Sequence, residues 1–74
     1  MPGIALAMTI TVNGRDEPFE AVTLTALLAS RDISLDERGI AVALNGAVVP
    51  RAAWAATALR AGDAVEIVRA RPGG

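Results

Sequence analysis

The stretch Ile40–Arg51, IAVALNGAVVPR, decides the fold. Large apolar residues alternate with alanines before Asn45-Gly46, and valines follow that dipeptide. Alternation with a period of two is typical of a β-strand with one buried face. Asn-Gly is the strongest short hairpin signal, because both central positions of a type I′ turn need a positive φ. The stretch therefore predicts two antiparallel strands, with Val48 pairing back across the turn and Pro50 ending the second strand. One face of the first strand is expected to hold the large side chains of Ile40, Val42 and Leu44, and the other face the small side chains of Ala41 and Ala43.

A second Asn-Gly hairpin is predicted in MTITVNGRDEPFEAV, residues 8–22. Apolar residues and threonines alternate over 8–13, which favours a strand. The partner strand is expected over about 17–22, with Phe19 and Ala21 facing inward. Pro18 cannot donate a ladder hydrogen bond, so it is expected at the start or on the edge of that strand.

One main helix follows the first hairpin. Thr23 is a suitable N-cap for a helix over about 24–31, whose apolar positions Leu24, Leu27 and Leu28 form one stripe. The polar segment after it reads as a loop, from which Ile33 and Leu35 are expected to pack under the helix end.

The last third of the chain predicts a short helix and a final strand. RAAWAATAL suits a short α-helix or a 3₁₀ turn with Trp54 as its anchor, and RAGD predicts a turn. AVEIVRA then predicts a strand with Val65 and Ile67 inward and Glu66 and Val68 outward. The order is β-β-α-β-β-(short helix)-β, an α+β class in which one helix covers one face of a sheet.

Composition bounds the function. Seventy-four residues make one domain with a small core, since sixteen of the hydrophobic residues are alanine. The chain has no Cys and no His, and all seven basic residues are Arg. Thiol nucleophiles, thiolate metal sites, the commonest base and Schiff-base lysines are therefore absent, which argues against an enzyme. No catalytic or metal-ligating residue is assigned.

Charge and hydropathy restrict the partners. A net charge of -1 provides no electrostatic footprint for nucleic acid. No apolar run approaches the roughly 18 residues of a membrane span, and the first residues lack a basic signal-peptide region. We therefore expect a cytoplasmic protein that binds neither nucleic acid nor membrane.

The order of elements, followed by RARPGG at the end, resembles the β-grasp or ubiquitin-like fold, here a mixed five-stranded sheet on one main helix. The stretches MTITVNG, ALNGAVVPRAAW and LRAGDAVEIV and the closing diglycine are closest to the ThiS-type sulfur carriers of thiamin biosynthesis, within the ThiS/MoaD family. The resemblance covers residues 8–74, and we expect a disordered N-terminal extension (1–7), a β-grasp domain (8–69) and a flexible diglycine tail (70–74).

The resemblance implies a carrier chemistry for the terminal carboxylate of Gly74. A ThiF-type adenylyltransferase would use ATP and Mg²⁺ to convert it to an acyl adenylate. A desulfurase system would supply sulfur to form a thiocarboxylate, which would pass sulfur to thiazole synthase. The carrier itself would bind no cofactor.

Four further tail residues are candidates for recognition by the adenylating partner. Gly73 has no side chain to obstruct a narrow channel, and Pro72 restricts the backbone before it. Arg69 and Arg71 read equally as solvated residues or as groups that dock on an acidic rim of the partner. The small outward face of Ala41, Ala43 and Val68 reads equally as ordinary exposed surface or as a partner surface.

Three alternatives remain open. A MoaD-like carrier for molybdopterin synthesis would have the same fold and tail chemistry. A protein tag would join Gly74 to an amine of another protein. A non-catalytic β-grasp interaction module would dock without using its tail.

Overall fold

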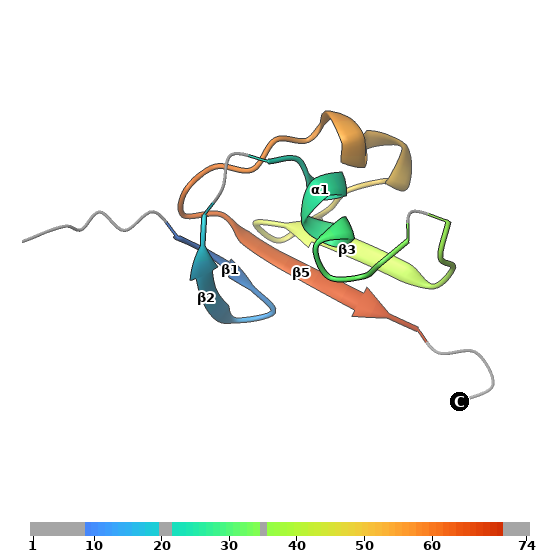
Figure 1. Ribbon diagram of the computed structural model, residues 1–74, viewed down its shortest axis with the longest axis horizontal. Coiled ribbons are helices and arrows are strands. Elements are labelled where there is room, and N and C mark those ends of the chain that lie inside the picture. The colour runs from blue at the N-terminus through green and yellow to red at the C-terminus, as the bar shows by residue number, and fades with distance from the viewer. Residues whose placement is uncertain (1–8, 20–21, 35, 71–74) are drawn as a thin grey trace, which may run out of the picture.

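The computed structural model describes residues 9–19, 22–34 and 36–70. Figure 1 shows one twisted sheet with the α-helix and the 3₁₀ segment on the same side of it. In chain order the elements are β1 (Thr9–Val12), β2 (Arg15–Pro18), α1 (Leu24–Ala29), β3 (Ile40–Leu44), β4 (Ala47–Val48), η1 (Arg51–Ala56) and β5 (Ala64–Arg69). The predicted order and α+β class are confirmed.

The sheet is mixed and has the strand order β2-β1-β5-β3-β4. β1 and β5 are parallel, whereas the other neighbouring pairs are antiparallel. The last strand in the sequence is therefore the central strand of the sheet, with a ladder on each side. The chain that follows β5 leaves from this central strand.

Both Asn-Gly turns have the expected conformation. Asn13 and Gly14 have φ values of 52° and 84°, and Asn45 and Gly46 have 52° and 87°. The Asn13-Gly14 turn places β2 earlier than expected. β2 spans Arg15–Pro18, so the prediction of a strand over 17–22 is wrong. A two-residue turn pairs the residue before it directly with the residue after it, as Val12 and Arg15 show.

Pro18 is the last residue of β2, which is an edge strand, so its missing N–H interrupts no inner ladder. Phe19 is half-buried and packs against the core as predicted. Met8, Ala21 and Leu35, for which inward positions were expected, lie outside the described residues.

The helix begins as predicted and ends earlier. The Thr23 hydroxyl accepts a hydrogen bond from the Ala26 amide at 3.2 Å, which confirms the N-cap. Regular helix stops at Ala29 instead of residue 31, because Asp32 adopts a left-handed φ of 61°. The Ile33 amide then bonds back to the Leu28 carbonyl at 3.0 Å, as in a Schellman motif. Glycine is the usual residue at the left-handed position, so an aspartate there hid the helix end.

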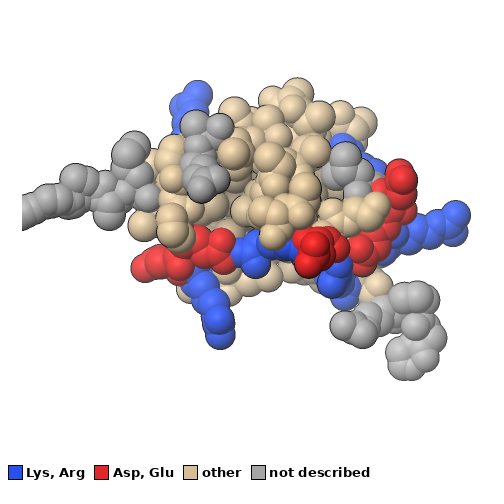
Figure 2. Space-filling view, in the orientation of Figure 1, with Lys and Arg blue, Asp and Glu red and all other residues tan. Residues whose placement is uncertain are grey.

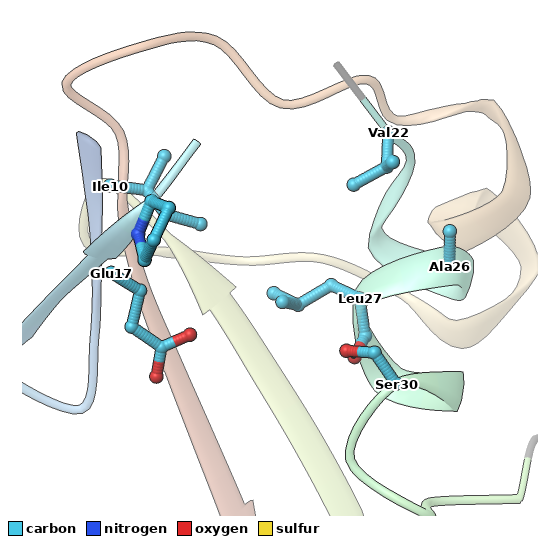
Figure 3. A pocket seen from close by; sticks show the side chains of 7 residues that line it. Ile10, Glu17, Val22, Ala26, Leu27 and Ser30 are labelled. Atoms are coloured by element: carbon cyan, nitrogen blue, oxygen red, sulfur yellow. The ribbon is translucent and has the colours of Figure 1, made fainter. Parts of the chain in front are cut away.

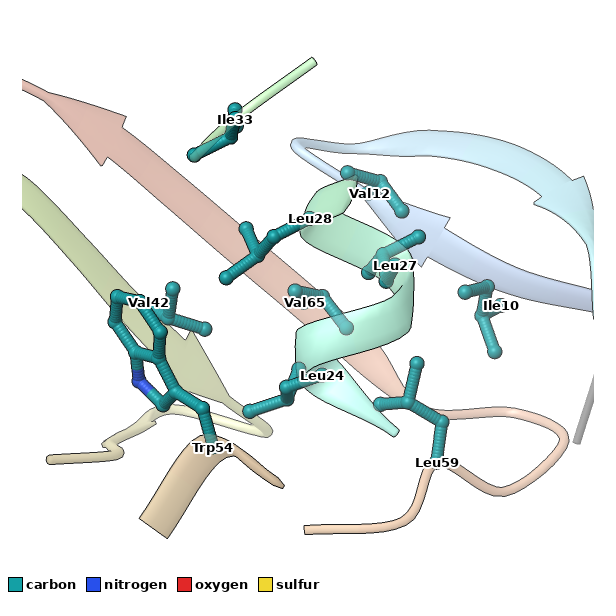
Figure 4. Packing of buried hydrophobic residues seen from close by; sticks show 10 residues of the cluster. All are labelled: Ile10, Val12, Leu24, Leu27, Leu28, Ile33, Val42, Trp54, Leu59 and Val65. Carbon is teal, nitrogen blue, oxygen red and sulfur yellow. The ribbon is translucent and has the colours of Figure 1, made fainter. Parts of the chain in front are cut away.

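Ten buried side chains form a single core between the sheet and the two helical segments (Figure 4). They are Ile10, Val12, Leu24, Leu27, Leu28, Ile33, Val42, Trp54, Leu59 and Val65. The predicted inward faces of β1, α1, β3 and β5 are confirmed. Trp54 is 2% exposed and is the largest of the set, which confirms it as the anchor of η1.

Candidate functional site

The end of β5 lies beside the loop that precedes β3 (Figure 1). Arg69, the last residue of β5, pairs with Ile40, the first residue of β3. The next amide, that of Ala70, donates to the Gly39 carbonyl at 2.7 Å. The antiparallel ladder therefore continues one step beyond β5, to Ala70, the first residue of the predicted tail (70–74).

Gly39 is required by the close approach of this neighbouring strand end. It has a φ of 78°, and a Cβ placed on it would lie 2.6 Å from the Ala70 carbonyl oxygen. A contact that short requires the backbone to move. Glycine at this position therefore allows the two chains to lie side by side.

A two-point ion pair joins the same segments. The Nε of Arg69 lies 3.1 Å from Oε2 of Glu37, and its Nη2 donates to Oε1 at 3.1 Å. Such a parallel fork is the geometry in which arginine binds a carboxylate best. The side chains are 41% and 36% exposed, so solvent screens the pair and its contribution to stability is modest.

The loop that carries Glu37 is tied to the core. Nη2 of Arg51 donates to the Glu37 main-chain carbonyl at 2.7 Å. The guanidinium of Arg51 lies 4.6 Å from the centre of the Trp54 ring, within range of a cation–π contact. Trp54 in turn donates from Nε1 to the Val49 carbonyl at 2.9 Å. A continuous series of contacts thus links the buried indole to the end of β5.

Of the residues predicted for recognition of the tail, one lies within the described part of the chain and four lie outside it. Arg69 lies in β5 and is paired with Glu37, whereas Arg71, Pro72, Gly73 and Gly74 lie outside the described residues.

The candidate partner surface lies on the face of the sheet opposite α1. Ala41 is opposite Val68 in the β3–β5 ladder, and Ala43 is opposite Val48 in the β3–β4 ladder. These four residues alternate with the buried positions of their strands, so they share the outer face. We call them the outer valine–alanine patch. Its two valines are the exposed large hydrophobic residues of the described chain, at 76% for Val48 and 59% for Val68.

A hollow of about 260 Å³ lies between β2 and α1 (Figure 3). It is lined by Ile10, Glu17, Pro18, Val22, Ala26, Leu27 and Ser30. Glu17 forms an ion pair with Arg31, so the one carboxylate of this lining is already engaged. A second hollow, about 240 Å³, is lined by Asn13, Arg31, Ile33, Ile67 and Arg69. In the first lining the Ser30 hydroxyl donates to the Leu27 carbonyl at 2.6 Å, so it does not face Glu17 as a nucleophile would face its base, and the second lining contains no carboxylate.

Charges of both signs are interleaved on the face shown in Figure 2, without a large patch of one sign. Among the described residues no group of three or more acidic side chains is placed to hold a metal ion. No described helix has the length and hydropathy of a membrane span.

Sequence reasoning assigned no role in a functional site to Glu37, Gly39 or Val48. Val48 was within reach, because the Asn-Gly turn sets the hairpin register and puts it opposite Ala43. Glu37 belongs to the polar segment that the sequence predicts as a loop, and its partner Arg69 is 32 residues away in the sequence. No local pattern signals that pairing.

Comparison with known proteins gives a consistent result. The model of the ThiS family matches residues 7–74, which include the diglycine. The crystal structure of the thiamine biosynthesis protein ThiS from Geobacter metallireducens is 36% identical and superposes with a TM-score of 0.74, covering 90% of this chain and all of that one. A solution NMR structure of a thiamine biosynthesis protein from the same organism is 37% identical, with a TM-score of 0.73, over 90% of this chain and 88% of that one.

A curated relative is much longer. A thiazole synthase from Paramagnetospirillum magneticum is 37% identical over 68 residues, which cover 90% of this chain and 20% of that protein. The chain therefore spans about a fifth of this relative's length. The family match over nearly the whole chain, together with the shared fold, confirms the resemblance seen in the sequence. The chain belongs to the ThiS family, the non-catalytic β-grasp sulfur carriers of thiamine biosynthesis.

Proposed function

We propose that the protein carries sulfur as a thiocarboxylate on Gly74 and donates it for thiazole formation. The observation that carries this proposal is the family match, which runs through the diglycine. The position of β5 supports it, because the tail follows the central strand of the sheet. The cosubstrate is then the chain's own carboxylate, and the domain serves to present it.

Activation of this carboxylate is needed because an α-carboxyl, with a pKa of about 3.3 to 3.7, is an anion and a poor electrophile at neutral pH. A carboxylate oxygen attacks the α-phosphorus of ATP in the ThiF-type adenylyltransferase, and pyrophosphate leaves. A sulfide-level sulfur nucleophile, supplied by a desulfurase system, then attacks the acyl carbon. The bond to AMP breaks, AMP departs, and the thiocarboxylate remains. ATP and Mg²⁺ belong to the partner in this scheme.

The tail has a limited reach. The Ala70 amide is bonded to the Gly39 carbonyl, and four residues, 71–74, follow this contact in the sequence. At about 3.3 to 3.6 Å per residue they reach roughly 13 to 14 Å. Gly73 and Gly74 have no Cβ to obstruct entry into a narrow channel, while Pro72 and Arg71 favour an extended approach.

The outer valine–alanine patch is the proposed docking surface for the adenylyltransferase. It adjoins the exit of the tail, since Val68 precedes Arg69 in β5. Exposed apolar patches of small domains often bind partners. Docking there would bring the tail to the partner's nucleotide site within the reach given above.

Thiazole synthase is the proposed acceptor of the sulfur. The support is that a protein named thiazole synthase contains a segment 37% identical to this chain. The same observation favours the thiamine branch over a MoaD-like role in molybdopterin synthesis. Because the chemistry consumes ATP, we place the protein in the cytoplasm.

The test is adenylation in a purified system. Incubation with ATP, Mg²⁺ and the cognate adenylyltransferase should release pyrophosphate with the intact chain and none after deletion of Gly73 and Gly74. Protein isolated from its own cells should include a form heavier by the difference between sulfur and oxygen at Gly74. Equal release from both chains would contradict the proposal and favour a docking module. A tail joined to another protein's lysine would instead make it a tag.

A further inference from the structure

We propose that Glu37 is a positioning residue for the adenylation step: with Gly39 it fixes the direction in which the tail leaves the sheet. The inference rests on the proposed function, since it concerns delivery of the same carboxylate. It assigns a role to the loop before β3, which carries no reacting group.

The main chain supplies the first restraint. The amide of Ala70 is bonded to the Gly39 carbonyl at 2.7 Å, and the absence of a Cβ on Gly39 permits that approach. A single terminal hydrogen bond at the end of a ladder frays easily. By itself it would let the last residues of β5 separate from the loop.

The fork between Glu37 and Arg69 supplies the second restraint. It joins the loop to β5 one residue before the ladder ends, so it opposes fraying at that point. A lysine in place of Arg69 would keep the charge but not the fork, because an ammonium group cannot present two parallel N–H donors.

Anchorage of the loop makes these restraints effective. The Glu37 main chain is held by Arg51, and the guanidinium of Arg51 lies over the buried ring of Trp54. A carboxylate on a loop without such a support would move with the tail. Here the contacts of Arg51 connect the loop, and through it the end of β5, to the buried Trp54.

This role for Arg69 differs from docking on an acidic rim of the partner. Nε and Nη2 of Arg69 already bind Glu37. If Arg69 docked on the partner, removing the charge of Glu37 would release it and leave adenylation unchanged or faster. If Arg69 and Glu37 act as a clamp, the same change slows adenylation. The two hypotheses predict opposite signs.

The experiment measures single-turnover adenylation at saturating adenylyltransferase for Glu37→Gln, Arg69→Gln, Arg69→Lys and the double variant Glu37→Gln/Arg69→Gln. Each single change should lower the rate about two- to fivefold, the range expected for one exposed ion pair. The double variant should be no slower than the slower single one, because both remove the same contact. The adenylyltransferase concentration that gives half of the maximal single-turnover rate should stay the same, since the outer valine–alanine patch is untouched.

Two neighbouring substitutions are the controls. Asp36→Asn removes a carboxylate one residue before Glu37, and Arg38→Gln removes a guanidinium one residue after it. Both side chains are exposed. The rates of these variants should match that of the unchanged chain. An unchanged or raised rate in Glu37→Gln, or additive losses in the double variant, would overturn the proposal.

A measurement without the partner separates this proposal from the proposed function. Hydrogen exchange of the Ala70 amide should be about two- to fivefold faster in Glu37→Gln and Arg69→Gln than in the two controls. Equal exchange in all variants would overturn the clamp even if the unchanged chain is adenylated. Faster exchange in a chain that releases no pyrophosphate would leave the restraint real and contradict the carrier function.

Discussion

At the residue scale, two glycines with similar backbone angles have different surroundings. Gly39 and Gly46 have φ values of 78° and 87°, both in the left-handed region. A Cβ on Gly46 would meet nothing within 4 Å, whereas one on Gly39 would meet the Ala70 carbonyl. Gly46 is therefore needed for its backbone angle alone, whereas Gly39 is needed for its backbone angle and for the space that a Cβ would fill.

Alanine substitutions should separate these two needs. Gly46→Ala should lower the free energy of unfolding by about 1 to 2 kcal/mol, the cost of a left-handed non-glycine residue. Gly39→Ala should cost about 2 to 4 kcal/mol, because the strand end must also move. Urea unfolding of both variants checks this difference, and equal losses would show that the approach of Ala70 carries no constraint.

At the element scale, short elements are held by their ends. Regular helix in α1 is six residues long, too short to be stable alone, and its first turn is bonded by Thr23. The segment 57–59 also contacts this end: the Leu24 amide donates to the Thr57 carbonyl at 3.0 Å, and the Leu59 amide donates to Val22 at 2.9 Å.

Removing the cap should therefore be measurable. Thr23→Ala should lower the free energy of unfolding by about 1 kcal/mol, because the Ala26 amide loses its partner. Thr25→Ala, inside the same helix, is the matched control and should be neutral or slightly stabilising, since alanine has the higher helix propensity. Thermal unfolding of both variants measures these changes, and similar losses of stability in the two would argue against the cap.

At the scale of the whole molecule, the two faces of the sheet differ. One face is covered by α1 and η1 over a core of ten residues, and the other presents the outer valine–alanine patch. The core is small, and domains of this size have little stability to spare. Function must therefore be tested with changes that leave the core alone.

Threonine in place of the two outer valines meets that condition. Val48→Thr and Val68→Thr keep the branched shape and strand propensity and should leave stability nearly unchanged. Each should raise the carrier concentration needed for half-maximal adenylation several-fold, if docking buries a methyl group worth about 0.8 kcal/mol. Ala55→Ser, an exposed change on η1, is the control. Unchanged half-saturation in the double valine variant would exclude this patch as the docking surface.

The sequence by itself determined the elements and the family. Alternating strands, two Asn-Gly turns, the Thr23 cap and the closing diglycine all depend on residues that are neighbours along the chain, so local physics is sufficient. The errors have the same origin: β2 began earlier and α1 ended earlier because tight backbone turns, one at an aspartate, set those boundaries.

Only the tertiary structure decided how the end of β5 is held. The parallel β1–β5 pairing makes the last strand central, and the antiparallel β3–β5 pairing brings residues 37–39 beside residues 69–70. The fork of Glu37 with Arg69 and the contact of Gly39 with Ala70 depend on that pairing across some thirty residues. A charge and a glycine in a loop acquire their roles from the strand that folds against them, and no pattern of near neighbours specifies which strand that is.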